Sequence, residues 1–181
     1  MTRFGGPAFR LDRDNINTDE IIPARYLTES SKTALQPHLL EDLLIDGKKF
    51  DRNTPELQQA TVLISRKNFG CGSSREHAVW VLEVNDISVV IAESFARIFR
   101  QNMFNCGILA IELDAAAIAD IFALPAPLAV QVDLSRSVVE IGPNGQQGSG
   151  SDLRTFPFTL NEFDRELIAA GGWLAYADSR Y

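Results

Sequence analysis

The chain has 181 residues, of which 45% are hydrophobic and 23% charged, which fits one globular domain, residues 1–181, with a core of its own. Its formal net charge is −7 and its sequence pI is about 4.8, and no basic stripe of the kind typical of nucleic-acid binders is visible. Nucleic acid is therefore excluded as an expected partner, and any site for a small anion has to be created locally.

The first third of the chain has little regular patterning. Residues 14–33 are polar and rich in turn formers, and we predict a loop or a strand end there because Pro23 cannot donate to a sheet ladder. Residues 36–50 contain the stretch PHLLEDLL, which predicts a short helix that ends at Asp46-Gly47.

From residue 60 onward, short apolar runs alternate with helical patterns. This alternation predicts an α/β layer in which the strands have parallel neighbours, because buried parallel strands are continuous apolar runs. The expected strands are residues 61–65, 87–92 and 107–113, and the expected helices are residues 73–84, 94–104 and 114–124.

The last part of the chain changes pattern again. Residues 128–134 and 138–142 flank a short polar turn and predict a hairpin, and residues 143–152 have the composition of a surface loop. Thr159 with Glu162 matches a capping box at the start of a final helix, and Gly171-Gly172 fits its end.

The cysteines and the N-terminus indicate the compartment. Cys71 and Cys106 do not form a CxxC pair, and two thiolates are too few for an iron–sulfur cluster. No signal peptide and no run of about 18 apolar residues is visible. We expect a cytoplasmic chain that has reduced thiols, binds no metal and does not enter a membrane.

The stretch NFGCGSSREH, residues 68–77, contains the strongest candidate site. The simplest interpretation is structural: Ser73 and Glu76 match a capping box that begins a helix, after a turn that Gly70 and Gly72 permit. The same arrangement exposes backbone N–H groups to an anion, and Arg75 adds a fork suited to carboxylate or phosphate.

Several kinds of chemistry are compatible with this stretch. It matches neither phosphate-loop pattern, so a carboxylate ligand fits at least as well as a nucleotide. A serine hydroxyl becomes reactive when nearby amides and a guanidinium stabilise its alkoxide. An acyl-transfer enzyme with Ser73 as nucleophile is a weaker alternative, because the stretch lacks the G-x-S-x-G pattern. His77 has a packing or supporting role in our interpretation.

Four motifs together resemble a known family. NTDEIIPARYL, NFGCGSSREHA, SFARIFRQNMFNCGIL and FDRELIAAGG are similar to the small subunit of 3-isopropylmalate dehydratase, which corresponds to the swivel domain of the aconitase superfamily. The resemblance extends from about residue 9 to residue 172 and implies a layered β/β/α fold with a mixed, partly parallel sheet.

The resemblance also implies an activity. Members of the family isomerise 2-isopropylmalate to 3-isopropylmalate through 2-isopropylmaleate, by dehydration and rehydration, in leucine biosynthesis. It implies a large-subunit partner, in a heterodimer or a higher assembly, and places the [4Fe–4S] cluster on that partner. It identifies Ser73 as the catalytic base, Ser74 and Arg75 as ligands of a substrate carboxylate, and Asp19 as a substrate-site residue.

The resemblance finally implies that residues 25–32, here called the substituent loop, contact the variable part of the substrate. Relatives that bind an extra carboxylate have an arginine after the pair equivalent to Tyr26-Leu27, where this chain has Thr28 and Glu29. That difference favours an apolar substituent, although Arg25 lies nearby. Alternatives are another substituted malate or maleate, such as citraconate, dimethylmaleate or homoaconitate, and, from another class, a stand-alone anion-binding module.

Overall fold

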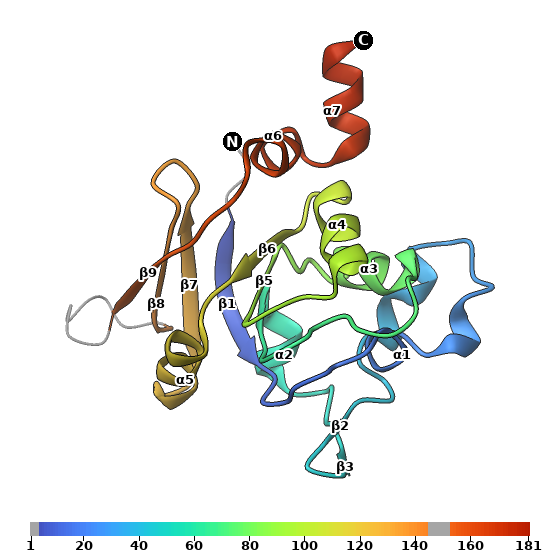
Figure 1. Ribbon diagram of the computed structural model, residues 1–181. Helices are drawn as coiled ribbons and strands as arrows, with labels where there is room; N and C mark the ends of the chain where they lie inside the picture. The colour runs from blue at the N-terminus through green and yellow to red at the C-terminus, as the bar shows by residue number, and fades with distance from the viewer. Residues whose placement is uncertain (1–3, 145–152) are drawn as a thin grey trace.

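The computed structural model describes residues 4–144 and 153–181, and it is built around a curled seven-stranded sheet (Figure 1). The strand order is β6-β5-β4-β1-β7-β8-β9. The strands are β1 (Gly5–Arg10), β4 (Val62–Ile64), β5 (Val89–Ala92), β6 (Leu109–Glu112), β7 (Leu128–Asp133), β8 (Val138–Pro143) and β9 (Arg154–Pro157).

The sheet has a parallel half and an antiparallel half that meet at β1. Strand β1 pairs in parallel with β4, and β4, β5 and β6 continue the parallel pairing. On its other edge β1 pairs antiparallel with β7, which begins the β7-β8-β9 meander. Every residue of β4 and β5 is buried, as expected for apolar strands covered on both faces. The predicted α/β fold with a mixed, partly parallel sheet is confirmed.

The helices flank this sheet. Figure 1 shows α3 and α4 side by side, with residues 18–40 beyond α3 and with α6 and α7 at the end of the molecule where the C-terminus lies. The α-helices are α1 (Thr18–Ile21), α2 (Pro55–Gln59), α3 (Glu76–Glu83), α4 (Arg97–Asn105), α5 (Ala115–Ala123), α6 (Glu162–Ala170) and α7 (Trp173–Arg180). Two short 3-10 helices, η1 (Ala24–Tyr26) and η2 (Thr33–His38), and the hairpin β2 (Leu44–Ile45)–β3 (Lys48–Lys49) complete the described elements.

The strand–helix alternation predicted from residue 60 is confirmed, and so is the hairpin that follows it, as β7 and β8. The helix predicted within residues 36–50 is wrong. Leu39, Leu40 and Leu43 are buried in the common core, and the backbone N–H of Leu40 donates to the carbonyl of Ile21 at 2.9 Å. Burial of these leucines in the core therefore determines the backbone conformation of this segment. Asp46-Gly47 forms the turn of the β2–β3 hairpin.

The C-terminal segment differs from the prediction at its start. The N-cap of α6 is Asn161, whose side chain accepts a hydrogen bond from the backbone N–H of Asp164 at 2.8 Å, so the Thr159 capping box is wrong. The predicted end at Gly171 is confirmed by its left-handed conformation. Of the surface loop predicted at 143–152, residues 145–152 lie outside the described part of the chain. Within the described residues, no helix is long and apolar enough to cross a bilayer.

Candidate active site

The stretch 68–75 leaves the sheet after β4 and runs beside the segment that precedes α1. The backbone N–H of Gly70 donates to the carbonyl of Ile16 at 2.8 Å, and the N–H of Thr18 donates to the carbonyl of Cys71 at 2.9 Å. These bonds, with a parallel bridge between Asn17 and Cys71, join two segments that lie more than fifty positions apart in the sequence. The two motifs that the sequence singles out therefore form one structural unit.

The capping box predicted at Ser73 and Glu76 is wrong. Helix α3 begins at Glu76, and its N-cap is Arg75, which has an extended backbone and no side-chain capping bond. The left-handed residue Gly72 turns the chain, and the carbonyl of Ser73 accepts a hydrogen bond from Thr18 Oγ1 at 2.9 Å. Ser73 and Ser74 consequently lie in the exposed segment that precedes the helix, and not in its first turn.

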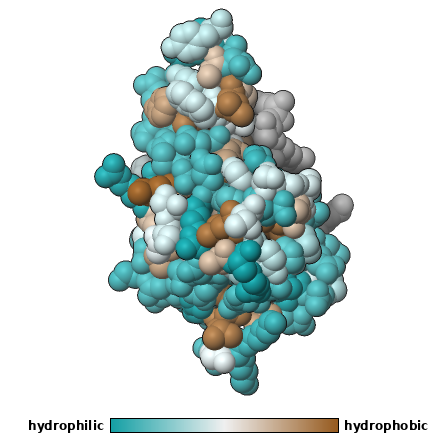
Figure 2. Space-filling view, turned by 90° about the vertical axis from the view of Figure 1, so that its right-hand side faces the viewer, coloured by the Kyte–Doolittle hydropathy of each residue, from teal (hydrophilic) through white to brown (hydrophobic). Residues whose placement is uncertain are grey.

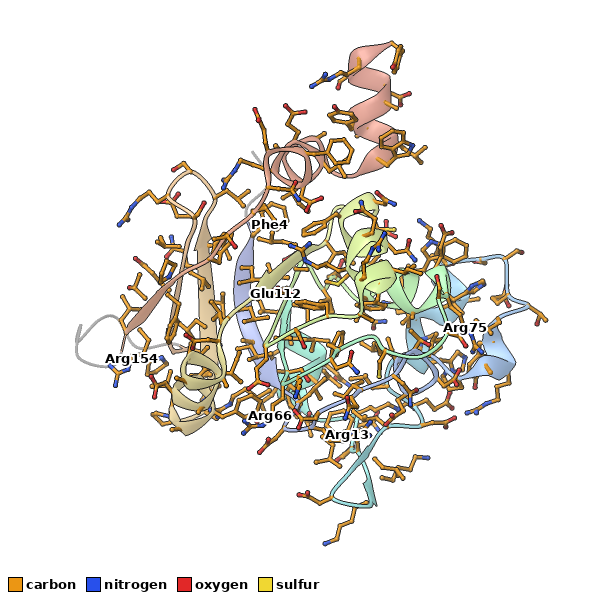
Figure 3. The ribbon with its side chains drawn as sticks, in the orientation of Figure 1. Phe4, Arg13, Arg66, Arg75, Glu112 and Arg154 are labelled. Carbon is orange, nitrogen blue, oxygen red and sulfur yellow. The ribbon has the colours of Figure 1, made fainter. Side chains whose placement is uncertain are left out.

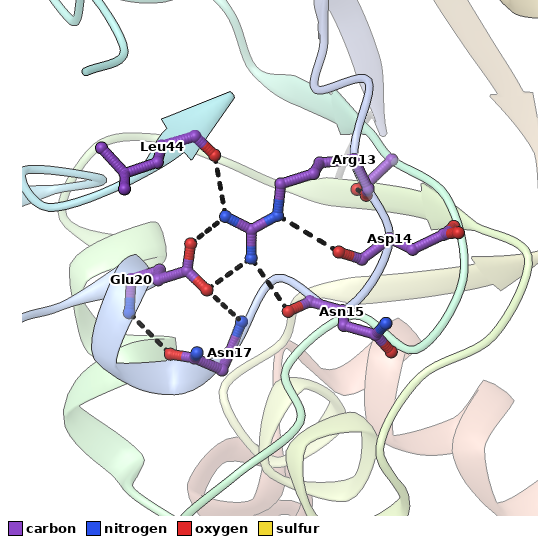
Figure 4. Close-up of polar contacts among 7 residues, drawn as sticks. Arg13, Asp14, Asn15, Asn17, Glu20 and Leu44 are labelled. Carbon is purple, nitrogen blue, oxygen red and sulfur yellow. Dashed lines mark hydrogen bonds and ion pairs between the residues drawn. The ribbon is translucent and has the colours of Figure 1, made fainter. Parts of the chain in front are cut away.

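A genuine capping box lies in the neighbouring motif instead. The Asn17 side chain accepts a bond from the Glu20 backbone N–H at 3.0 Å, and the Glu20 carboxylate accepts from the Asn17 N–H at 3.5 Å. Arg13 forms an ion pair with Glu20 and donates to the carbonyls of Leu44 and Asn15 at 2.8 and 3.0 Å (Figure 4). The N-x-x-E spacing of Asn17 and Glu20 is a sequence signal that could have revealed this turn.

The structure brings Asp19 and Arg75 together. Arg75 Nη1 donates to Asp19 Oδ1, and this ion pair connects α1 with the start of α3. Figure 3 labels Arg75 at this position. The Arg75 side chain is 23% exposed and that of Asp19 is 57% exposed. The ion pair restrains the guanidinium of Arg75, the residue that follows Ser73 and Ser74. Arg75 keeps further N–H donors that could bind a carboxylate.

Arg25, the cation at the start of the substituent loop, is already paired with carboxylates of this chain. Arg25 donates to the two carboxylate oxygens of Asp42 at 2.8 and 3.2 Å and lies 3.4 Å from a carboxylate oxygen of Glu41. The hydrogen bond from Arg25 lowers the pKa of Asp42 below its usual value. Tyr26 stacks on His38 with ring centroids 3.8 Å apart. The N-terminal side of the loop is thus held against residues 38–42.

The C-terminal side of the substituent loop contacts α3. His77 Nε2 lies 2.9 Å from the backbone carbonyl oxygen of Glu29, which can only accept, so this nitrogen carries the hydrogen. The Glu29 carboxylate accepts bonds from the N–H groups of Ser30 and Ser31, both at 3.1 Å. Lys32 Nζ lies 3.0 Å from Glu83 Oε2. The predicted supporting role of His77 fits this geometry.

The residues of this chain do not fit an iron–sulfur cluster. Burial raises the pKa of the Cys106 thiol to about 11, which disfavours the thiolate that a metal requires, and burial also raises the pKa of Cys71. Across residues 4–144 and 153–181, no group of three or more His, Cys, Asp or Glu side chains is arranged to hold a metal ion.

A comparison with known protein families shows the class to which this chain belongs. The model of the aconitase C-terminal domain family matches residues 2–116, and the chain belongs to that family, as the motifs predicted. Figure 2 shows that the side of the molecule carrying α1 and α3 is largely hydrophilic, with separate apolar patches.

A solved structure is similar over almost the whole chain. It is the crystal structure of 3-isopropylmalate dehydratase from Methanocaldococcus jannaschii, with 29% sequence identity and a TM-score of 0.74. The match covers 99% of this chain and 95% of that one, so the likeness includes the C-terminal helices that lie beyond the family match.

Proposed function

We propose that this chain is the small subunit of a 3-isopropylmalate dehydratase, a hydro-lyase that acts together with a large subunit. The observation that carries the proposal is the unit formed by Asp19, Ser73, Ser74 and Arg75 on a fold of the aconitase family. Both serines are exposed, so this chain alone supplies no enclosure for a substrate. A partner that covers this face would complete the site.

The proposed roles follow from the chemistry of each group. Ser73 removes the carbon-bound proton of the substrate, and its alkoxide is stabilised by Arg75 and by backbone N–H groups at the start of α3. Ser74 and Arg75 bind a substrate carboxylate, and Asp19 orients Arg75. We further propose that the [4Fe–4S] cluster belongs to the large subunit and that the enzyme is cytoplasmic.

The substrate class follows from the substituent loop. Arg25 is paired with Asp42 and Lys32 with Glu83, so a substrate carboxylate would have to compete with a carboxylate of this chain for either cation. A third substrate carboxylate would need a free cation in this loop, whereas an alkyl substituent would not. This argument supports a dicarboxylate with an apolar substituent, with 2-isopropylmalate as the leading candidate.

The substitution Ser73→Ala tests the assignment of the base. In the reconstituted complex with the large subunit, kcat for isomerisation should fall by about 10²- to 10⁴-fold, the usual contribution of a positioned general base. The matched control is Ser135→Ala, which changes an exposed serine in the turn between β7 and β8 and should leave kcat unchanged. Co-purification with the large subunit reports assembly. Turnover near the wild-type rate in an assembled Ser73→Ala complex would rule out this role.

A further inference from the structure

We infer that His77 is a positioning residue that sets the distance between the substituent loop and the reacting serine, and so determines which substituents the enzyme accepts. The inference rests on the proposed function. Its basis is the 2.9 Å hydrogen bond from His77 Nε2 to the carbonyl of Glu29, across 48 positions of the sequence.

Helix α3 is the common frame of the two halves of the site. Arg75 is its N-cap and Ser73 lies two residues earlier, while His77 is its second residue. A bond from His77 to the loop therefore links the group that contacts the substrate substituent to the groups that bind and deprotonate the substrate. The rotation of the His77 ring is restricted by Trp80, whose ring centroid lies 4.6 Å away.

The other attachments of the loop provide this link weakly or not at all. Arg25 and Tyr26 hold the N-terminal side of the loop against residues 38–42 and not against α3. Lys32 does reach Glu83 and lies over Trp80, but both partners of that ion pair are substantially exposed, at 44% and 39%, and exposed pairs contribute little. The part-buried bond from His77 is the stronger attachment of the loop to α3.

The charged side chains of the loop are engaged within the chain, so the position of its backbone and of its uncharged side chains defines the space for a substituent. Arg25 is paired with Asp42, and the Glu29 carboxylate caps the N–H groups of the next two residues. A displacement of Glu29 then changes the room beside the serines without changing the carboxylate-binding groups. The effect should be larger for an isopropyl group than for a methyl group, because the larger group contacts more of the loop.

The test compares two substrates in the reconstituted holoenzyme, 2-isopropylmaleate and the methyl analogue citraconate. His77→Phe keeps a ring but removes the donor, and it should lower the ratio of kcat/KM values, isopropyl over methyl, by about threefold to tenfold, the worth of one hydrogen bond. His77→Gln places an amide N–H at a similar distance from the backbone and should restore the ratio.

The matched control is Asn85, which lies just after the C-terminal end of α3. Asn85 Nδ2 donates to the carbonyl of Gln36 at 3.1 Å, which is also a bond from a side chain to a neighbouring backbone but lies outside the substituent loop. Asn85→Ala should leave the substrate ratio unchanged. If His77→Phe does not assemble, Lys32→Met removes the weaker attachment of the same loop and should shift the ratio in the same direction.

The outcomes separate this inference from the function on which it rests. A wild-type complex that hydrates both substrates, with a ratio unmoved by His77→Phe and by Lys32→Met, would overturn the positioning role and leave the proposed function intact. Equal losses for both substrates would also overturn it, because they indicate a purely structural role. A wild-type complex that hydrates neither substrate would overturn the proposed function and the inference together.

Discussion

Gly70 lies where the stretch 68–75 packs against helix α4, and replacing it tests how closely that stretch is held. Its φ is +80°, a conformation that side chains rarely adopt. A Cβ atom at this position would lie 2.3 Å from both Cγ and Cδ1 of Phe99 and 2.8 Å from its Cβ. Phe99 is 3% exposed and its ring packs edge-on against Phe69, so it has little freedom to move away.

The magnitude follows from separating two contributions. Positive φ costs an L-residue about 1–2 kcal/mol, of which about 0.4–1 kcal/mol is offset by the smaller entropy of the unfolded chain. Overpacking against Phe99 adds about 1–3 kcal/mol. Gly70→Ala should therefore lower the free energy of unfolding by about 1–5 kcal/mol.

Gly47 provides the matched control. Its φ is +73°, and a Cβ atom there would meet nothing within 4 Å, so Gly47→Ala carries only the conformational cost of about 1 kcal/mol. The assay is urea unfolding of the wild type and the two variants under identical conditions. In a Phe99→Ala background only the 2.8 Å contact with the Cβ of residue 99 remains, so the effect of Gly70→Ala should fall toward, but stay above, that of Gly47→Ala. Equal losses for the two glycine variants in the wild-type background would refute the reasoning.

Two further predictions concern stability. Arg10 Nη1 donates to the carbonyls of Ile121, Phe122 and Leu124 at 3.0, 3.1 and 2.7 Å at the end of α5, so Arg10→Met should cost about 2–3 kcal/mol in urea unfolding, with an unchanged midpoint contradicting this role. Burial raises the pKa of Cys106 to about 11 from an ordinary 9.0, so the folded state holds this proton more tightly than the unfolded state. This proton binding contributes to the free energy of unfolding. The contribution is fully present below pH 9 and is lost as the pH rises to about 11. In thermal unfolding over that range the wild type should lose more stability than Cys106→Ala, and parallel curves would contradict the assignment.

The strands and helices between residues 61 and 124 could be predicted from sequence because β4 and β5 are fully buried apolar runs and β6 is buried and apolar up to Glu112. Strand β1 could not, because its sequence GGPAFR has low strand propensity. Its glycines are required by close packing: a Cβ at Gly5 would lie 2.4 Å from the Val130 carbonyl oxygen, and one at Gly6 would lie 2.3 Å from Thr61 Oγ1. These contacts come from segments that are distant in the sequence, so local patterning does not reveal them.

The residues assigned to the candidate site stay a prediction, and their geometry could not be predicted from the sequence. Ser73 and Glu76 have the spacing of a capping box, yet the helix begins at Glu76 because the preceding residues are held by the bond from Thr18 to the Ser73 carbonyl. The Asp19–Arg75 ion pair joins positions 56 residues apart. Such pairings depend on how the two segments are placed by the sheet, which one sequence alone does not specify.

The central claim is tested most directly by measuring hydration of 2-isopropylmaleate by the cognate large subunit, reconstituted anaerobically, with and without this chain. Our account predicts activity only when both are present. Full activity of the large subunit alone, or no activity of the combined subunits with an intact cluster and a confirmed complex, would contradict it.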